Sequence, residues 1–262
     1  YSAILENYKK RCDMLAISKI PDVYSYLPHL SDVKHLDDVD KSREYDLVIN
    51  VDVASIDRIC DAKILFDKAK FNVNIDHHKT NNAYGKLNFI NPGASSTGEV
   101  LFECFSRMGW KVNLNTAICI YTAILTDTGS FRFDNTKPST FETASKLVEI
   151  GVNPSDIYKK VYESDSKTLV MFQAHCISKA KFLNDDKIAY TLVYKKDMEK
   201  FGAGDDCMEG LTEKLRAIVT TRIAFVAKEM KSGGTKISMR SKFADVAEIC
   251  GIFGGGGHKY AA

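Results

Sequence analysis

The sequence predicts an α/β protein in which a parallel sheet carries helices on both faces and is followed, through a helical connector, by a smaller α+β domain. Residues 46–52 and 71–76 have the apolar composition of strands, and residues 53–70 leave room for one crossover helix between them. From residue 96 the apolar spacing becomes helical, and near residue 188 it becomes strand-like again. A chain of 262 residues is long enough for about two domains.

The individual elements follow from the same patterns. The chain begins with a predicted helix over residues 2–11 and a short apolar run over 12–17. Ser96 or Thr97 is a suitable N-cap for the first helix of the central region. Further helices are expected over residues 115–126, 139–150, 154–163 and 166–181. A strand over 188–194, a hairpin formed by 218–230 and 236–240, and a helix over 246–253 complete the chain. The expected divisions are therefore a first domain over 1–163, a connector over 164–183 and a second domain over 184–262.

Composition and charge exclude several classes of protein. The formal net charge is +2, which argues against a protein that coats long nucleic acids through bulk charge. No uncharged stretch reaches the ~20 apolar residues that a membrane span requires. The seven cysteines include no C-x-x-C pair, so we expect reduced thiols and a cytoplasmic location, without a disulfide framework or zinc knuckle.

A candidate metal site gathers acids and imidazoles from three segments of the first domain. Asp52 ends one predicted strand, and Asp76-His77-His78 ends the next. The carboxyl ends of parallel strands meet at one sheet edge, and carboxylates with imidazoles suit Mn, Fe, Co or Zn. Asp127 directly follows an apolar helix, where a carboxylate opposes the helix dipole unless a cation lies nearby. The alternatives are a packed or exposed histidine and ordinary capping or loop-starting acids.

A candidate phosphate site lies near the end of the chain. Four consecutive glycines, Gly254 to Gly257, let backbone N–H groups approach an anion closely, and His258 follows them. Arg240, at the end of a predicted strand, can add a charge-assisted hydrogen bond to the same anion. The alternative is a flexible linker, but linkers are usually mixed with Ser and lie between domains.

Taken together, these motifs resemble those of the DHH phosphoesterases with a C-terminal DHH-associated domain. The resemblance rests on Asp52, Asp76-His77-His78, residues 126–129 and residues 254–262, so it covers nearly the whole chain. Within the family it is strongest to the nanoRNase type. It implies a DHH domain, a helical connector and a DHH-associated domain, with two Mn²⁺ ions as cofactors, Mg²⁺ or Co²⁺ being alternatives.

The resemblance also implies a role for each motif residue. Asp52 would bridge the two metals, His77 and Asp127 would ligate the second, and Asp76 would be a further ligand or support them. His78 would face the substrate phosphate, completing the catalytic set of Asp52, Asp76, His77, His78 and Asp127. The substrate would contact Arg132, Arg240, Gly255, Gly256, Gly257 and His258.

The implied activity is hydrolysis of short oligoribonucleotides to 5′-mononucleotides and removal of the 3′-phosphate of 3′-phosphoadenosine 5′-phosphate (pAp), by two-metal activation of a bridging water. A phosphodiesterase for linear or cyclic di-adenylate is the alternative within the family. The expected partners are short RNA or pAp and a second copy in a homodimer, with no membrane.

One family motif, His-x-x-x-Asp-x-Asp, is absent from the sequence. Residues 35–40 have the nearest spacing, but their acids fall three and five positions after His35, and we interpret them as an acidic surface turn. A parallel sheet that lacked this motif's strand would expose an apolar edge. We therefore expect the motif shortly before Tyr1 in the intact gene product. If it is truly absent, the chain would be a non-catalytic nucleotide-binding module.

Overall fold

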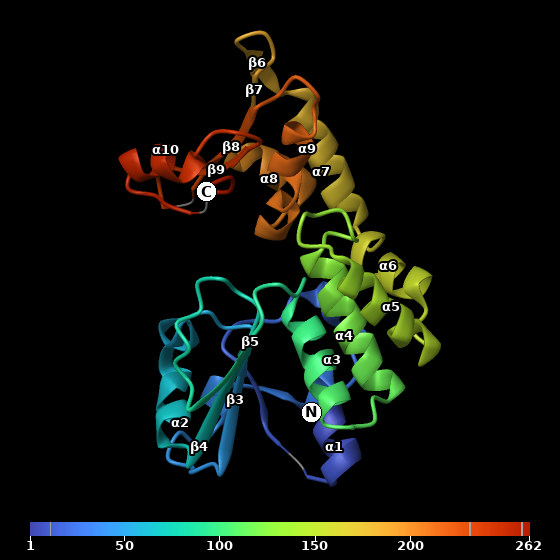
Figure 1. Cartoon of the computed structure of the whole chain (residues 1–262). Helices are drawn as coiled ribbons and strands as arrows, with labels where there is room; N and C mark the ends of the chain where they lie inside the picture. Colours follow the sequence, from blue (N-terminus) through green and yellow to red (C-terminus); the bar gives the residue numbers. More distant parts are fainter. Residues whose placement is uncertain (11, 231, 258) are drawn as a thin grey trace. The chain divides into compact units, whose positions relative to one another are not determined.

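The computed structural model describes residues 1–10, 12–230, 232–257 and 259–262, which form two compact units (Figure 1). The first unit is Tyr1–Ser164 and the second is Asp165–Ala262. This division falls between residues 163 and 184, the two limits predicted from the sequence.

The first unit contains a parallel sheet, as predicted, and the sheet has three strands. Its strands, in spatial order, are β3 (Leu47–Val51), β4 (Phe71–Asp76) and β5 (Leu87–Ile90). The register aligns Val51 with Ile75, so β3 and β4 end at the same edge of the sheet. That edge carries the residues that follow the two predicted strands.

Helices cover both faces of this sheet, which confirms the predicted fold class. Val73 and Ile75 pack in a buried cluster with residues of α3 (Thr97–Arg107). Side chains alternate along a strand, so Asn72 points to the opposite face. There its amide donates to the carbonyl of Phe66 in α2 (Lys63–Lys68). In Figure 1 these helices lie on opposite sides of the sheet.

The main core of the first unit forms around α4 (Leu114–Asp127). Its buried side chains pack against α3 and against α5 (Pro138–Glu149) and α6 (Pro154–Tyr162). Ala117, Ile124 and Leu147 are completely buried there. The helix therefore holds its C-terminal residue, Asp127, on a rigid support.

Other parts of the first unit are α1 (Ser2–Tyr8) and a two-stranded parallel sheet formed by β1 (Met14–Ala16) and β2 (Val33–His35). A single 3₁₀ turn, Leu36–Asp38, follows β2, and Asp37 and Asp38 are exposed in it. The predicted acidic surface turn is therefore confirmed. Strands β2 and β5 were not predicted, because three or four residues are too few to establish a period.

The segment 53–70, predicted to leave room for a crossover helix, contains one, but the helix is short and occupies only the end of the segment. A 3₁₀ segment, Ile56–Ala62, precedes the short α2, and Cys60 inside that segment has a φ of 48°, outside the helical region. Ser55 donates to the carboxylate of Asp57 at the start of this segment. Short polar side chains of this kind compete with helical hydrogen bonds and favour turns.

The second unit is an α+β domain with a four-stranded sheet. The order is β6 (Lys181–Leu183), β7 (Ile188–Val193), β8 (Ile223–Glu229) and β9 (Thr235–Ser241). Strands β7 and β8 are parallel, whereas β8 and β9 form the predicted antiparallel hairpin. The remaining helices are α7 (Lys167–Ser178), α8 (Lys195–Phe201), α9 (Leu211–Arg216) and α10 (Val246–Ile252).

Helix α7 lies in the segment expected to connect the domains, and it packs into the core of the second unit. Phe172 of this helix is completely buried beside Leu211 and Leu215 of α9. The expected helix over 166–181 ends at Ser178, because Lys181 already pairs with Tyr190 in the sheet. The apolar face of α7 thus stabilises the second unit.

A buried carboxylate joins α7 to α8 in this unit. Asp197 accepts hydrogen bonds from Lys179 Nζ (2.7 Å), His175 Nε2 (3.1 Å) and the backbone N–H of Tyr194 (3.1 Å). Burial by itself raises the pKa of Asp197, but these three hydrogen bonds outweigh it and lower the pKa to about 2.

The Asp197 carboxylate makes the stability of the second unit depend on pH. Because the folded pKa of Asp197 is below its unfolded value, its contribution is present above about pH 4 and is lost as the pH falls toward 2. Over this range we expect the unfolding free energy of the native protein to fall by about 2 kcal/mol more than that of Asp197→Asn. Urea unfolding of both proteins at pH 4.5 and pH 2 measures the difference. Parallel loss in the two proteins would contradict it.

Candidate metal centre

The carboxyl edge of the first unit's sheet carries predicted site residues from two neighbouring strands. Asp52 follows β3, and its backbone N–H donates to the carbonyl of Ile75 at 3.0 Å, which extends the strand pairing by one residue. Its φ of 61° turns the chain sharply out of the strand. Asp is among the few residues other than Gly that tolerate this left-handed conformation. The carboxylate thus projects over the edge of the sheet.

The next strand ends in Asp76, which is completely buried and anchors the two histidines that follow it. Its Oδ1 accepts from the backbone N–H of His77 (2.8 Å) and from Nδ1 of His78 (2.7 Å). Burial raises the pKa of Asp76, but hydrogen bonds from Asn81, His78 and the His77 backbone lower it overall, so the group is an ionised acceptor. Nδ1 of His78 must therefore carry a hydrogen, and Nε2 is its other polar atom.

Asp127 approaches the same place from the C-terminus of α4. Nε2 of His77 lies 3.6 Å from Oδ1 of Asp52 and 3.8 Å from Oδ2 of Asp127. Burial, and then the negative charge of Asp52, raise the pKa of Asp127 to about 6, against smaller opposing effects of His77 and His78. Two carboxylates and an imidazole thus converge although they are far apart in sequence.

This arrangement fits a divalent cation. Asp52, Asp76, His77 and His78 offer ligand atoms that all lie within 4.8 Å of one another. The donor set of carboxylate oxygen and imidazole nitrogen suits Mn²⁺ and similar ions. The proximity of Asp52 to Asp127 is unfavourable without a counter-charge, and a cation between them would supply it.

Two supporting residues were not found from the sequence. Thr97 donates to Oδ1 of Asp52 at 2.7 Å, and Asn135 donates to the backbone carbonyls of Asp127 (3.1 Å) and Ser95 (2.8 Å). The sequence offered Thr97 as an alternative N-cap, a role that Ser96 fills by accepting from the Glu99 backbone. No local pattern distinguishes Asn135 from an ordinary loop residue.

The loop after Asp127 is conformationally strained. Gly129, Ser130 and Phe131 have φ values of 54°, 62° and 61°, a run of left-handed residues that costs about 1–3 kcal/mol for each non-glycine. Arg132 follows them, and its Nε donates to the Gly129 carbonyl at 2.6 Å. Arg132, a predicted substrate contact, therefore helps to stabilise the loop in which it lies.

Most of the other predicted substrate-binding residues lie together in the second unit. Arg240 of β9 forms an isolated antiparallel β-bridge with Ala261. Beside it, Met239 and Ala262 exchange two backbone hydrogen bonds. The glycine run thus leads back to the edge of β9. Arg240 Nε also donates to Glu213 Oε1 at 2.6 Å. His258 lies outside the described residues.

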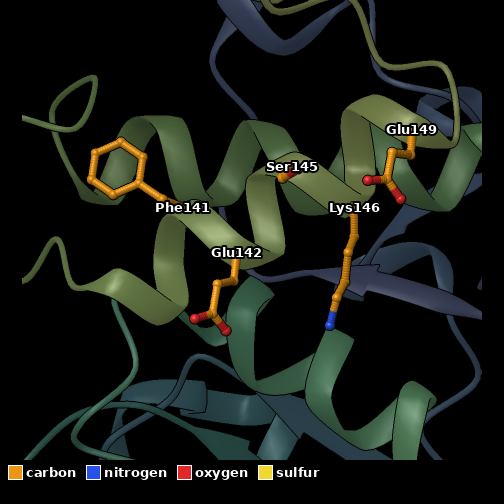
Figure 2. Close-up of a pocket in the computed structure, with 5 residues that line it drawn as sticks. All are labelled: Phe141, Glu142, Ser145, Lys146 and Glu149. Carbon is orange, nitrogen blue, oxygen red and sulfur yellow. The ribbon is translucent and has the colours of Figure 1, made fainter.

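A surface depression lies on α5 in the first unit (Figure 2). It is an open hollow of about 550 Å³ lined by Phe141, Glu142, Ser145, Lys146 and Glu149. Figure 2 shows Glu142 and Lys146 pointing to one side of the helix. With two acids and one lysine, this surface has no excess positive charge for phosphate. It contains none of the predicted site residues.

All seven cysteines are free. Within the described residues, no helix has the length and apolarity needed to cross a lipid bilayer.

Comparison with known proteins identifies the family. The model of the DHH family, N-terminal domain, matches residues 2–124. The bifunctional oligoribonuclease and PAP phosphatase NrnA of Bacillus subtilis (strain 168) is 30% identical over 239 residues, which cover 90% of this chain and 75% of the relative. The probable enzyme of the same name from Streptococcus mutans is 28% identical over 236 residues, with the same coverage.

A solved structure has a similar fold. The crystal structure of an exopolyphosphatase-related protein from Bacteroides fragilis has a TM-score of 0.88 and 25% sequence identity, covering 95% of this chain and 76% of that protein. The family model and the identity to relatives agree with the motifs at the carboxyl edge of the sheet. The chain therefore belongs to the DHH family of phosphoesterases.

Proposed function

We propose that this protein is a Mn²⁺-dependent hydrolase that degrades short oligoribonucleotides to 5′-mononucleotides and removes the 3′-phosphate of pAp. The observation that carries the proposal is the convergence of Asp52 and Asp127 on Nε2 of His77, at 3.6 and 3.8 Å. The names of the Bacillus subtilis and Streptococcus mutans relatives support this choice of substrates.

In this proposal the first unit holds the metal and the reacting phosphate. Asp52, His77 and Asp127 would ligate the metal, and a pair of such ions supplies a hydroxide nucleophile and stabilises charge on the phosphate oxygens. Asp76 would act mainly by orienting the histidines, since its Oδ1 accepts from His77 N and His78 Nδ1. Nε2 of His78 would then contact a phosphate oxygen, and a protonated ring would donate a charge-assisted hydrogen bond.

The second unit would bind the rest of the nucleotide. Arg240 and the backbone N–H groups of Gly256 and Gly257 would offer donors for a phosphate, whereas the N–H of Gly255 donates to the Cys250 carbonyl at 2.9 Å and would have to exchange that partner for the substrate. Arg132, in the first unit, keeps the substrate contact predicted for it. His258 retains the substrate-binding role predicted for it. The assignment of residues 184–262 as the substrate-binding domain is part of the same proposal.

The test is a product profile of the gene product that contains this chain. The substrates are pAp, RNA of two to five nucleotides, linear and cyclic di-adenylate, and polyphosphate, each with Mn²⁺, Mg²⁺, Co²⁺ or a chelator. We expect inorganic phosphate from pAp and 5′-mononucleotides from RNA, fastest with Mn²⁺ and lost with chelator. Preference for di-adenylate would favour the alternative substrate class. Binding of pAp without turnover under every metal condition would indicate a non-catalytic binding module instead.

The homodimer and the cytoplasmic location stay predictions. Light scattering of the purified protein measures the first, with a mass of about twice the 29.3 kDa of this chain, plus any additional residues, as the expected result. A monomer at micromolar concentration would contradict it.

A further inference from the structure

Asn81 makes an unusually complete set of hydrogen bonds beside the candidate metal centre. Its Nδ2 donates to Oδ2 of Asp76 at 2.6 Å and to the backbone carbonyl of Val53 at 3.1 Å. Its Oδ1 accepts from Nδ2 of Asn74 at 3.1 Å and from the backbone N–H of Ala83 at 2.8 Å. Both amide hydrogens and both lone pairs of the carbonyl oxygen are thus in use.

The partners of Asn81 also fix which way its amide points. The two groups on the nitrogen side are a carboxylate and a carbonyl, which only accept, and the two on the oxygen side are N–H donors. A flipped amide would place its nitrogen against the two N–H donors and its oxygen against the two acceptors, so none of the four hydrogen bonds could form. An aspartate has the same shape but cannot donate, so only an asparagine satisfies all four partners at this length.

Two of these partners adjoin the candidate metal ligands. Val53 follows Asp52 in the chain, and Asp76 precedes His77. The backbone pairing of β3 with β4 ends where the Asp52 N–H meets the Ile75 carbonyl. Beyond that point Asn81 connects the two strand ends through its side chain, where no strand pairing continues.

We propose that Asn81 is a positioning residue that sets the geometry of the metal centre by clamping the end of β3 to Asp76. With this clamp in place, Oδ1 of Asp52 lies 3.6 Å from Nε2 of His77. Hydrogen-bond partners of metal ligands commonly contribute about 10–100-fold to metal affinity. The inference rests on the proposed metal site of Asp52, His77 and Asp127.

The test is Mn²⁺ binding by calorimetry, with Asn81→Asp and Asn82→Asp as a matched pair. Both variants add one negative charge, and Asn82 is the exposed neighbour. Charge alone predicts tighter Mn²⁺ binding in each variant. Loss of the clamp predicts that Asn81→Asp binds Mn²⁺ about 10–100-fold more weakly than the native protein, while Asn82→Asp binds as well or better.

Two controls keep the result interpretable. Asn81→Ala, which removes the clamp without adding charge, should weaken Mn²⁺ binding to a similar extent, and the thermal unfolding midpoint of the metal-free variants shows whether they fold. If Asp52→Asn weakens Mn²⁺ binding but folded Asn81→Asp and Asn81→Ala bind like the native protein, this inference is overturned and the proposed function stands. If Asp52→Asn also leaves Mn²⁺ binding unchanged, the proposed metal site itself is wrong.

Discussion

Asp52→Asn is expected to lower kcat/KM for pAp by at least about 10³-fold and to reduce the bound Mn²⁺. The asparagine oxygen can still accept the Thr97 hydrogen bond, and asparagine tolerates the left-handed backbone at this position, so the fold should be retained. What is lost is an anionic ligand, and metal stabilisation of a phosphoryl transition state is worth several kcal/mol. Steady-state kinetics and metal analysis on the same preparation measure both effects.

Asp57→Asn is the matched control for this variant. Asp57 carries the same charge and lies five positions further along the chain, where its carboxylate is exposed and accepts from Ser55. We expect its kinetics to remain within about twofold of the native enzyme, as is usual for exposed surface positions. Equal activity of the two variants would remove Asp52 from the catalytic machinery.

Gly257→Ala is expected to raise KM for pAp by about 5–100-fold with a smaller change in kcat. Gly257 has a φ of 153°, and a Cβ there would lie 2.5 Å from the Cα of Ala262 and 2.6 Å from the carbonyl oxygen of Ala261. Backbone strain of this kind costs about 1–3 kcal/mol. The alanine would therefore displace the C-terminal residues from Arg240, where the candidate phosphate site forms.

Gly251→Ala isolates the effect of this close approach. Gly251 is exposed in α10, outside the glycine run, and a Cβ there meets no atom within 4 Å, so this variant should keep the KM of the native enzyme within about twofold. Thermal unfolding of both variants shows whether any change extends to the whole second unit. Unchanged KM for Gly257→Ala would argue that the C-terminal segment takes no part in substrate binding.

The sequence was sufficient to predict the sheet edge that carries the metal centre. The apolar runs before Asp52 and Asp76 are long enough to identify as strands, and parallel pairing then requires their ends to meet. The unfavourable position of Asp127 at a helix C-terminus provided an independent signal, and the structure brings its carboxylate within 3.8 Å of His77.

The supporting residues could not be predicted in the same way. Thr97 acts through one hydrogen bond to Asp52, and Asn81 through four, two of which reach Asp76 and the carbonyl of Val53. The sequence around these two residues carries no information about those partners. The length of the crossover helix in residues 53–70 was likewise not predictable, since the backbone turns at Cys60 and the helix is confined to Lys63–Lys68. Tertiary contacts, rather than local pattern, determine both.

The left-handed backbone at Asp52 restricts which acids this position can accept. Glutamate would preserve the negative charge, yet its longer side chain has no short-range hydrogen bond to offset a cost of about 1–2 kcal/mol for this conformation. A library randomised at this codon should therefore recover folded protein mainly with Asn or Gly and active protein with Asp, so the chemistry and the turn select the same residue.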